Sequence, residues 1–317
     1  MEKFNILVCD GMDQGLFSDL KKISEFNVLG EAKNNSEVIN SLKKQAHALV
    51  IRSATKPDQA FLDECENLKY IIRAGEGTDN IEKSYCEKIG VKVSNTPGAN
   101  NNSAAEHAVA LMMTLLRKTA WANDSMQTGT WNKAAFTGNE LTNKKVGIVG
   151  FGRIGQLVAK RLIGFDPEIF YFDPYCDKHK VPYENVSKRE LEFVFENSDI
   201  VTVHVPLLDS TKNLIDYNLF SKMKPTSIFV NAARGGIVNE QDLLKALKEK
   251  KLKAAAMDVF ATEPLKEKTS LHGVGELLLT PHLGGSTEEA QFRVGEMAVH
   301  QLKEFFINKN LLNEVKA

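Results

Sequence analysis

The sequence predicts an α/β protein built from two doubly wound parallel sheets, on two observations. Short apolar, β-branched runs alternate with segments of helical periodicity along most of the 317 residues, and such alternation is typical of parallel sheets covered by helices. One of these runs, 145–149, ends in a Gly-x-Gly-x-x-Gly turn over 150–155 that passes directly into a helical pattern. The length corresponds to about two domains, so we expect a second domain beside the one that contains the glycine turn.

Residues 1–98 are expected to form the first of the two domains. Strand-like runs and helical segments alternate there, as in a flavodoxin-like domain, and this part of the sequence has no phosphate-binding glycine fingerprint of its own. We expect strands at 4–9, 28–32, 48–51, 70–72 and 91–93, and helices at 36–44 and 57–62. The turn formers of segment 95–102 mark the end of the domain.

A long apolar helix is expected to follow that turn. Ser103 and Glu106 have the spacing of a capping box, which predicts a helix from His107 onward. We expect this helix to cross into the second domain or to lie at an interface, which suits a homodimer. After the polar, loop-like segment 128–143, the sheet of the second domain begins with the strand that leads into the glycine turn. Its later strands are expected at 199–204, 227–231, 254–259 and 277–280.

The last part of the sequence predicts a discontinuous domain. Ser286 and Glu289 have capping-box spacing, and apolar residues then recur at helical spacing. Chains of this layout often return their last helix to the N-terminal domain. We therefore expect segments 1–98 and 286–317 to form a substrate-binding domain, with a Rossmann-like dinucleotide-binding domain, 99–285, inserted between them.

The glycine turn and the acid that follows it predict a dinucleotide site. Gly150 permits the tight turn, Gly152 allows the backbone to approach a pyrophosphate, and Gly155 lets the helix pack against the strand. The helix, whose N-terminus faces the phosphates, begins with Arg153 and Ile154. Glycine turns that bind nothing share this spacing, but Asp173 follows about 20 residues further on, where a Rossmann fold places the acid that binds the ribose hydroxyls. A carboxylate there repels a 2′-phosphate, so NAD is predicted rather than NADP.

The composition argues against several other classes of protein. Forty basic and 41 acidic residues give a formal net charge of −1, so no global field attracts nucleic acid or an anionic membrane. No apolar run is long enough for a signal peptide at the N-terminus or for a membrane span, and we expect a cytoplasmic protein. The four cysteines show no Cys-x-x-Cys spacing, and no metal site is expected.

Three chemically competent side chains follow the last strands of the second domain. Arg234, Glu263 and His282 come shortly after three consecutive strand-like runs. Because ligands bind at the carboxyl ends of parallel strands, we expect these side chains to converge on the crevice that holds the nicotinamide. The alternatives are that Arg234 only neutralises a helix C-terminus and that Glu263 is a solvated loop acid.

Four motifs of the chain are distinctive when they are taken together. They are the glycine turn, Asn-Ala-Ala-Arg-Gly-Gly-Ile-Val at 231–238, Met-Asp-Val-Phe-Ala-Thr-Glu-Pro at 257–264 and Thr-Pro-His-Leu-Gly-Gly-Ser-Thr at 280–287. Over nearly the whole chain the sequence resembles the NAD-dependent D-2-hydroxyacid dehydrogenase family. Segments 51–56 and 73–81 are most similar to the D-3-phosphoglycerate dehydrogenases of that family. The resemblance thus implies oxidation of D-3-phosphoglycerate to 3-phosphohydroxypyruvate, a step of serine biosynthesis.

The resemblance also implies a role for each of the three side chains. His282 transfers the proton of the substrate C2 hydroxyl as hydride passes to or from the nicotinamide. Glu263 orients His282 and favours its cationic form. Arg234 binds the substrate carboxylate and polarises the C2 oxygen. Further cofactor contacts are implied at Thr78, Val205, Pro206, Ala232, Ala233, Asp258, Gly284 and Gly285.

Substrate recognition is expected in the N-terminal domain. Arg52, Lys56 and Arg73 follow two strand ends and, in the orientation that the family implies, face the crevice. Arg52 and Lys56 are four residues apart and suit a phosphate group, with a solvated loop as the alternative. The implied substrate contacts are Arg52, Ser53, Lys56, Arg73, Gly75 and Gly77, together with Arg234 and His282. Glu76 departs from the small or apolar residue expected in that loop.

Two other functions stay open on the sequence alone. The first is a dehydrogenase or reductase for another D-2-hydroxy acid, of the glycerate, glyoxylate or lactate type. The second is an NAD-sensing scaffold protein, since such relatives can retain the Arg, Glu and His. Arg52, Lys56 and the lack of long disordered tails argue against a scaffold. Only a short tail is expected after the last helix, so no C-terminal regulatory domain is expected.

Overall fold

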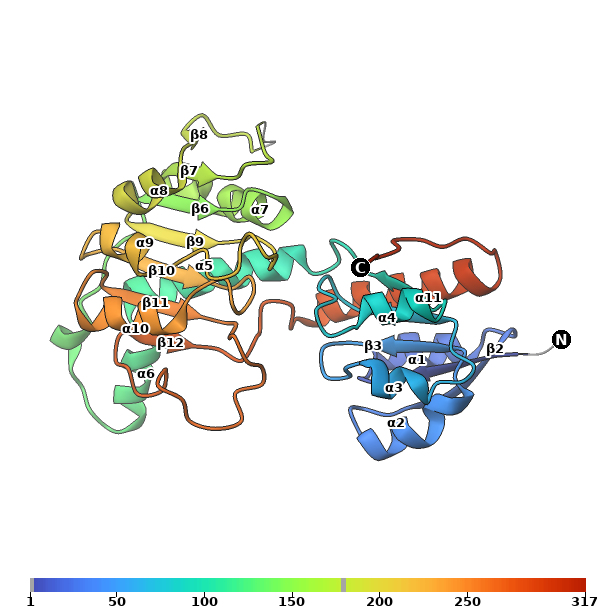
Figure 1. The fold of residues 1–317 in the computed structure, drawn as a ribbon. Helices are drawn as coiled ribbons and strands as arrows, with labels where there is room; N and C mark the ends of the chain where they lie inside the picture. Colours follow the sequence, from blue (N-terminus) through green and yellow to red (C-terminus); the bar gives the residue numbers. More distant parts are fainter. Residues whose placement is uncertain (1–2, 178–180) are drawn as a thin grey trace. The chain divides into compact units, whose positions relative to one another are not determined.

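The computed structural model describes residues 3–177 and 181–317, which form two compact units (Figure 1). Unit 1 comprises Met1–Asn100 and Gly285–Ala317, and unit 2 comprises Asn101–Gly284. The boundaries expected from the sequence, after residues 98 and 285, lie close to these positions. Each unit is built on its own parallel sheet.

Unit 1 contains a five-stranded sheet. Its strands are β1 (Phe4–Val8), β2 (Phe26–Glu31), β3 (Ala48–Ile51), β4 (Tyr70–Arg73) and β5 (Lys92–Asn95). They lie in the order β2-β1-β3-β4-β5, and each neighbouring pair is parallel. This is the strand order of a flavodoxin-like sheet, whose switch point lies between β1 and β3. The prediction of a doubly wound parallel sheet is confirmed for this unit.

Helices cover both faces of the unit 1 sheet. They are α1 (Gln14–Lys21), α2 (Ser36–Leu42), the 3₁₀ helix η1 (Lys43–Gln45), α3 (Gln59–Asp63), α4 (Lys83–Lys88) and α11 (Glu288–Phe306). Alternate residues of each strand point to opposite faces. Apolar residues of α1 and α11, such as Phe17 and Leu302, pack on one face. Residues of α2, α3 and α4, such as Ile39, Leu62 and Cys86, pack on the other.

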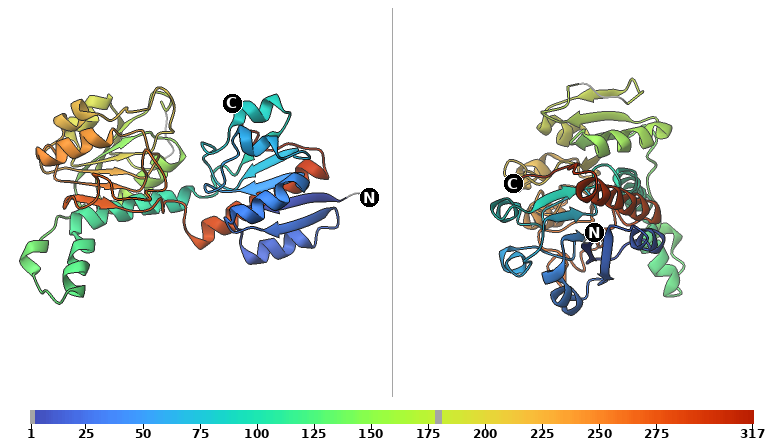
Figure 2. Two further views of the ribbon diagram at one scale, coloured as in Figure 1. Left: turned by 60° about the horizontal axis from the view of Figure 1, so that its bottom comes forward. Right: turned by 90° about the vertical axis from the view of Figure 1, so that its right-hand side faces the viewer.

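The segment that follows unit 2 in the sequence completes unit 1. Helix α11 lies against β4 and α1 (Figure 2). Tyr70 of β4 stacks on Phe305 of α11, with 4.2 Å between the ring centroids. Beyond the helix, the Val315 N–H donates to the Val93 carbonyl beside β5 at 2.8 Å. Residues from both ends of the sequence therefore share one hydrophobic core.

Unit 2 contains a seven-stranded parallel sheet. Its strands are β6 (Lys145–Val149), β7 (Glu168–Phe172), β8 (Val186–Lys188), β9 (Ile200–Val203), β10 (Ile228–Asn231), β11 (Ala254–Met257) and β12 (Leu277–Leu279). They lie in the order β12-β11-β10-β9-β6-β7-β8. Counted from β6, the first six strands have the Rossmann order 3-2-1-4-5-6, with β12 added at one edge. The switch point of this sheet therefore lies between β6 and β9.

Two layers of helices cover the sheet of unit 2. The helices are α5 (Asn101–Arg117), α6 (Thr119–Gln127), η2 (Lys133–Phe136), α7 (Arg153–Leu162), η3 (Ile163–Phe165), α8 (Leu191–Asn197), α9 (Tyr217–Lys222) and α10 (Glu240–Lys248). Helices α5 and α7 pack around a core that includes Val146 and Ile148 of β6. Helices α8, α9 and α10 pack around a second core that includes Val149 and Phe229. Both sheet faces are thus buried, as expected for strands that are apolar almost throughout.

Both predicted capping boxes differ from what the structure shows. Helix α5 begins at Asn101, so Ser103 and Glu106 lie inside it. Ser103 is buried, and Glu106 pairs instead with Arg161 of α7 at 2.9 Å. At α11, the hydroxyl of Thr287 accepts the capping hydrogen bond, from the Ala290 N–H at 3.2 Å. Tertiary packing, rather than the local pattern, sets the start of α5.

The apolar side of α5 is used inside unit 2. Its buried residues, among them Ala108, Leu111 and Met112, pack against α7, β10 and β11. The helix therefore enters the second unit, which was one of the two expectations. The other expectation, that its apolar side forms a subunit interface, does not fit, because that side is buried within unit 2. By contrast, α6 and η2, which lie wholly in the described part of the chain, contain no buried residue. Figure 2 shows both extending away from the sheet of unit 2.

Candidate active site

The three predicted catalytic side chains follow three adjacent strands. Strands β10, β11 and β12 are parallel neighbours, with Asn231 opposite Met257 and Met257 opposite Leu279. Their carboxyl ends therefore meet at one edge of the sheet, and the loops that carry Arg234, Glu263 and His282 start there.

The first two of these loops are in direct contact. A Cβ atom on Gly235, which directly follows Arg234, would lie 1.7 Å from the backbone oxygen of Phe260, three residues before Glu263. No side chain fits in that space, so a glycine is required for the loops to approach so closely.

His282 and Glu263 form the tightest contact of the site. His282 Nδ1 lies 2.6 Å from Glu263 Oε2, and Glu263 Oε1 accepts the Phe260 N–H at 2.9 Å. Burial acts to raise the pKa of Glu263, but the hydrogen bonds from His282 and Phe260 outweigh it and lower that pKa. An ionised carboxylate only accepts hydrogen bonds, so Nδ1 of His282 carries the hydrogen. The other nitrogen, Nε2, is left as a proton acceptor when the ring is neutral.

The loop that carries Arg234 is shaped by a buried asparagine. Asn231 is fully buried, and its Oδ1 accepts the Ala233 N–H while its amide donates to the Arg234 carbonyl, both at 3.1 Å. Arg234 Nη1 in turn donates to the Ala233 carbonyl at 2.7 Å. These bonds fix the backbone that presents the guanidinium.

The glycine turn has the geometry that a dinucleotide needs. Gly150 has a φ of 91°, and a Cβ there would lie 2.7 Å from the carbonyl of His204 after β9. A Cβ on Gly155 would lie 2.2 Å from the Gly150 oxygen. A Cβ on Gly152 would meet no atom within 4 Å, and Gly152 caps α7 without a side-chain hydrogen bond. The open space thus lies at the N-terminus of α7, where backbone N–H groups favour a phosphate.

Asp173 both shapes this turn and remains able to bind a ribose. Its Oδ2 accepts the Phe151 N–H at 2.7 Å, and its Oδ1 accepts the Tyr175 N–H at 2.8 Å. Each carboxylate oxygen can accept a further hydrogen bond. The acid therefore holds the glycine turn against β7 and keeps acceptors for ribose hydroxyls, so the residues present fit the predicted cofactor.

The remaining predicted cofactor contacts are divided between the units. Val205 and Pro206 follow β9, and Ala232 and Ala233 follow β10, in unit 2. Asp258 is fully buried there, and both of its carboxylate oxygens accept hydrogen bonds from the segment around His282. Gly284 and Gly285 lie on either side of the unit boundary, and Thr78 belongs to unit 1. The Thr78 hydroxyl is buried and accepts a bond from Lys83 Nζ at 3.3 Å.

His204 introduces a pH dependence of stability. His204 is half-buried, its ring lies 3.0 Å from the Thr202 hydroxyl, and burial lowers the pKa of His204 to about 4. Below an unfolded pKa of about 6.5, the unfolded chain binds a proton that the folded chain does not. As the pH falls from 6.5 to 4, we therefore expect the unfolding free energy to decrease by about 3 kcal/mol in total from this residue.

Denaturant unfolding at pH 7 and pH 5 checks this expectation. His204→Gln should show a smaller loss of unfolding free energy between the two pH values than the wild type. His300→Gln, at an exposed position of α11, should lose as much as the wild type. Equal losses in all three proteins would contradict the assignment to His204.

In unit 1, Asp10 and Asn80 hold the loop that begins with Arg52. Asp10 Oδ2 accepts the Arg52 N–H at 2.5 Å and the Thr55 N–H at 3.1 Å, and Oδ1 accepts the Thr55 hydroxyl. The amide of Asn80 donates to the Arg52 and Thr55 carbonyls at 2.8 and 2.7 Å. Ser53 and Lys56 are exposed. The loop is therefore fixed at both ends while its tip faces solvent.

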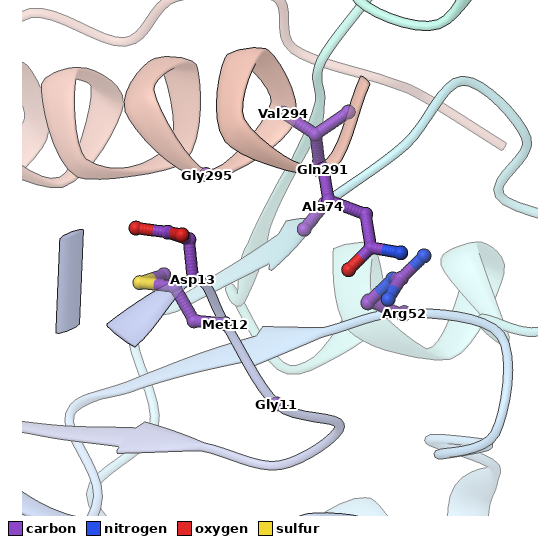
Figure 3. Close-up of a pocket in the computed structure, with 8 residues that line it drawn as sticks. All are labelled: Gly11, Met12, Asp13, Arg52, Ala74, Gln291, Val294 and Gly295. Atoms are coloured by element: carbon purple, nitrogen blue, oxygen red, sulfur yellow. The ribbon is translucent and has the colours of Figure 1, made fainter. Parts of the chain in front are cut away.

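A small pocket lies beside Arg52 (Figure 3). It is lined by Gly11, Met12, Asp13, Arg52, Ala74, Gln291, Val294 and Gly295. These residues follow β1, β3 and β4 or belong to α11, so the pocket lies at the switch point of unit 1, where ligands of doubly wound sheets bind. The side-chain amide of Gln291 points toward the Arg52 guanidinium (Figure 3), which makes no hydrogen bond or ion pair within residues 3–177 and 181–317. Lys56 does not line the pocket.

Contacts of Arg73 and Glu76 shape the loop that follows β4. Gly75 has a φ of 148°, and a Cβ there would lie 1.4 Å from Arg73 Nη1, so the guanidinium folds across the glycine. Glu76 Oε2 accepts the Gly98 N–H at 2.6 Å. The acid that departs from the expected pattern therefore fixes the turn at the end of the first segment of unit 1. Gly77 follows it with no side chain to cover the loop.

Several residues that build these sites were not singled out from the sequence. They are Asp10, Asn80, Asn231 and Gln291. Asp10 lies two residues after β1, and Asn231 is the last residue of β10, so both could have been found by the rule that nominated Arg234. Asn80 and Gln291 act across long stretches of sequence and carry no local signal.

The described residues give no sign of a membrane span or a metal site. Within 3–177 and 181–317, no helix is both long and apolar enough to cross a bilayer. In the same part of the chain, no three His, Cys, Asp or Glu side chains are grouped so that they could hold a metal ion.

Comparisons with known proteins agree with this geometry. Residues 109–284 match the family model described as "D-isomer specific 2-hydroxyacid dehydrogenase, NAD binding domain". The chain is 38% identical over 304 residues to hydroxypyruvate reductase of Thermotoga maritima, covering 95% of this chain and 98% of that protein. It is 40% identical over 262 residues to D-3-phosphoglycerate dehydrogenase of Archaeoglobus fulgidus, covering 83% of this chain but only 50% of that protein.

A solved structure is similar over the whole length. The NAD-dependent formate dehydrogenase of Staphylococcus aureus in complex with NAD superposes with a TM-score of 0.86 at 29% identity, covering 99% of both chains. The family model spans more than half of the 317 residues, and its NAD-binding domain falls within unit 2, which holds the glycine turn and Asp173. The chain belongs to the D-isomer specific 2-hydroxyacid dehydrogenase family, whose members are NAD-dependent oxidoreductases, as the sequence motifs predicted.

Proposed function

We propose that the protein oxidises D-3-phosphoglycerate to 3-phosphohydroxypyruvate, with Arg234, Glu263 and His282 as its catalytic residues. The observation that carries the chemistry is the 2.6 Å contact between His282 Nδ1 and Glu263 Oε2 at the carboxyl edge of the sheet. It fixes the ring and leaves one nitrogen free for proton transfer, which is the arrangement that a general acid and base needs.

In this proposal His282 moves the substrate proton. In oxidation, Nε2 of the neutral ring takes the proton of the C2 hydroxyl, and in reduction the cationic ring returns it. Glu263 stabilises the cation that forms and keeps the ring from rotating. When bound, the nicotinamide supplies the acceptor or the donor of the hydride at C2. Arg234 offers a planar fork of donors, which suits the substrate carboxylate and the C2 oxygen.

The cofactor is proposed to be held mainly by unit 2. The residues assigned to it are Gly150, Gly152, Arg153, Ile154, Gly155, Asp173, Val205, Pro206, Ala232, Ala233, Asp258, Gly284, Gly285 and Thr78. The open space at Gly152 and the remaining acceptors of Asp173 support the pyrophosphate and ribose assignments.

The phosphate of the substrate is proposed to bind at Arg52. This guanidinium lines a pocket at the switch point of unit 1, and its donors are not used by the described residues. The Gln291 amide points toward this guanidinium and adds further donors (Figure 3). Arg73, Gly75 and Gly77 are proposed to offer donors to the rest of the substrate, and Ser53 and Lys56 stay as proposed contacts at the exposed loop.

A second substrate class is favoured by one relative. The hydroxypyruvate reductase of Thermotoga maritima is matched over 98% of its length, whereas the chain spans about half the length of the phosphoglycerate dehydrogenases. Hydroxypyruvate, glyoxylate or a lactate-type acid is therefore the alternative substrate. These compounds lack the phosphate for which Arg52 is proposed.

A parallel assay tests the proposal. Purified protein is incubated with NADH and 3-phosphohydroxypyruvate, hydroxypyruvate, glyoxylate or pyruvate, and the loss of nicotinamide absorbance is followed. We expect the highest kcat/KM with 3-phosphohydroxypyruvate. A higher value with hydroxypyruvate would reject the phosphorylated substrate, and no turnover with any of the four would reject the catalytic proposal in favour of an NAD-sensing role.

Replacing Arg52 separates the two substrate classes. Arg52→Met is expected to lower kcat/KM for 3-phosphohydroxypyruvate by about 30-fold, since a charge-assisted hydrogen bond to phosphate contributes about 2 kcal/mol. The value for glyoxylate should change by less than about threefold. Lys69→Met, at an exposed position before β4 and outside the pocket, is the matched control. Equal losses for both substrates in Arg52→Met would show that Arg52 does not bind the phosphate.

The chain is also proposed to work in the cytoplasm, where NAD and small phosphorylated acids are found.

The protein is further proposed to form a homodimer. Short helices are marginal in water unless they pack against other parts of a protein. Helix α6 contacts the core of unit 2 through the partly buried Trp121. Apart from this contact, α6 and η2, which are fully described, contain no buried residue, and Trp131 between them is 80% exposed. A second copy that covers this extension explains both features. A monomeric mass in light scattering would reject the proposed homodimer.

A further inference from the structure

His107 lies on α5, outside the proposed catalytic set, and contacts the support of the His282 loop. Its Nε2 lies 3.1 Å from Asp258 Oδ1 and 3.3 Å from Thr280 Oγ1. The side chain of Asp258 is 0% exposed, and that of His107 is 18% exposed. The imidazole of His107 therefore contacts the buried carboxylate of Asp258, which directly follows β11.

Asp258 holds most of the backbone around His282. Its Oδ1 accepts the Leu283 N–H at 2.7 Å, and its Oδ2 accepts the Gly284 N–H at 2.9 Å. Its backbone carbonyl accepts the His282 N–H at 2.8 Å. His282 itself has a φ of 53°, a left-handed conformation that non-glycine residues rarely adopt without support. The hydrogen bonds to Asp258 supply that support.

The hydrogen bonds around Asp258 also fix which atom of His107 carries a hydrogen. Burial acts to raise the pKa of Asp258, but the hydrogen bonds from His107, Thr280 and Leu283 outweigh it and lower that pKa. The ionised carboxylate only accepts, and the Thr280 hydroxyl gives its one hydrogen to Asp258 Oδ1 at 2.6 Å. Nε2 of His107 must therefore be the donor in its contact with Asp258.

We propose that His107 is a positioning residue for the dehydrogenase reaction, whose Nε2–H donor holds Asp258 so that Asp258 can hold the backbone of His282, Leu283 and Gly284. Without this donor, a buried carboxylate oxygen loses a partner and the carboxylate can shift away from the loop. The orientation of the His282 ring then depends on Glu263 alone. This inference rests on the proposed role of His282 in proton transfer.

Two replacements of His107 separate the donor from the bulk of the ring. The amide of His107→Gln can place an N–H close to the position of Nε2, whereas His107→Leu fills similar space without a donor. We expect kcat of His107→Leu to fall about tenfold or more, since the lost bond goes to a charged group. His107→Gln should keep kcat within about threefold of the wild type. NADH affinity, followed by fluorescence, should fall in His107→Leu but not in His107→Gln, because Asp258 and Gly284 are also proposed cofactor contacts.

A readout without substrate tests the same contact. In hydrogen exchange measured by mass spectrometry, peptides that cover 280–285 should exchange faster in His107→Leu than in the wild type and His107→Gln. Glu106→Gln is the matched control, because the neighbouring residue of α5 pairs with Arg161 and not with Asp258. It should leave both kcat and the exchange of this segment unchanged.

The possible outcomes either support or reject the inference. If His107→Leu keeps wild-type kcat and exchange, His107 does not position the loop. If His107→Gln is as impaired as His107→Leu, the ring packing matters and the donor does not, which also rejects the inference. If the wild type itself has no turnover, the proposed function fails, and the exchange experiment still decides whether His107 supports the loop.

Discussion

Replacing His282 by alanine is expected to lower kcat by roughly 10²- to 10⁴-fold, the range that a positioned general acid or base contributes. The variant retains Arg234 and the glycine turn, so NADH affinity should stay close to that of the wild type. Steady-state kinetics in the direction of NADH oxidation give kcat, and the fluorescence of bound NADH gives the affinity. A loss of kcat with unchanged NADH binding would assign His282 to proton transfer.

Two further variants make this result specific. His300→Ala removes an exposed imidazole from α11 and should have wild-type kcat. Glu263→Gln keeps an oxygen that can accept from His282 Nδ1 but removes the charge, so kcat should fall less than in His282→Ala. A kcat of His282→Ala within about tenfold of the wild type would exclude the residue as the main proton donor.

Replacing Gly152 by alanine is expected to weaken NADH binding by about 100-fold without destabilising the fold. The new methyl group meets no protein atom within 4 Å, but it occupies the space through which a pyrophosphate approaches the N-terminus of α7. A 100-fold loss corresponds to about 2.7 kcal/mol, which is between one and two charge-assisted hydrogen bonds. Titration of NADH fluorescence measures the affinity, and denaturant unfolding measures the stability.

Other glycines give the controls for this experiment. Gly150→Ala should lower the unfolding free energy, because φ is 91° and the methyl group would lie 2.7 Å from the His204 backbone. Gly164→Ala, which also meets nothing within 4 Å, should change neither property. Normal NADH binding by Gly152→Ala would place the pyrophosphate elsewhere.

The sequence was sufficient for those parts of the fold and site that depend on local pattern. The alternation of apolar runs and helical segments predicted both sheets, and the glycine turn predicted the first strand of the Rossmann sheet, β6. The strand-end rule also placed Arg234, Glu263 and His282 after adjacent strands. Each of these predictions uses residues that are close together in the sequence or a general rule of parallel sheets.

What the sequence could not predict depends on contacts between distant residues. The carboxylate of Asp10 holds the Arg52 loop from 42 residues away. Gln291 reaches the same pocket from α11, and His107 reaches Asp258 from α5. The start of α5 was mispredicted for the same reason, since Ser103 is buried against the unit instead of capping the helix. Periodicity and capping rules describe single elements and contain no information on such pairs.

The position of α11 in the sequence has a consequence for synthesis. On the ribosome, the whole of unit 2 emerges before α11 does. Until then, one face of the β1 to β5 sheet is covered by α1 but lacks Val294, Ala298 and Leu302 of α11. Domains that are continuous in sequence fold as they emerge, and here the inserted domain is the continuous one. The loops that carry Arg234, Glu263 and His282 can thus reach their native form first, and the sheet that carries Arg52 is the part exposed to aggregation in the nascent chain.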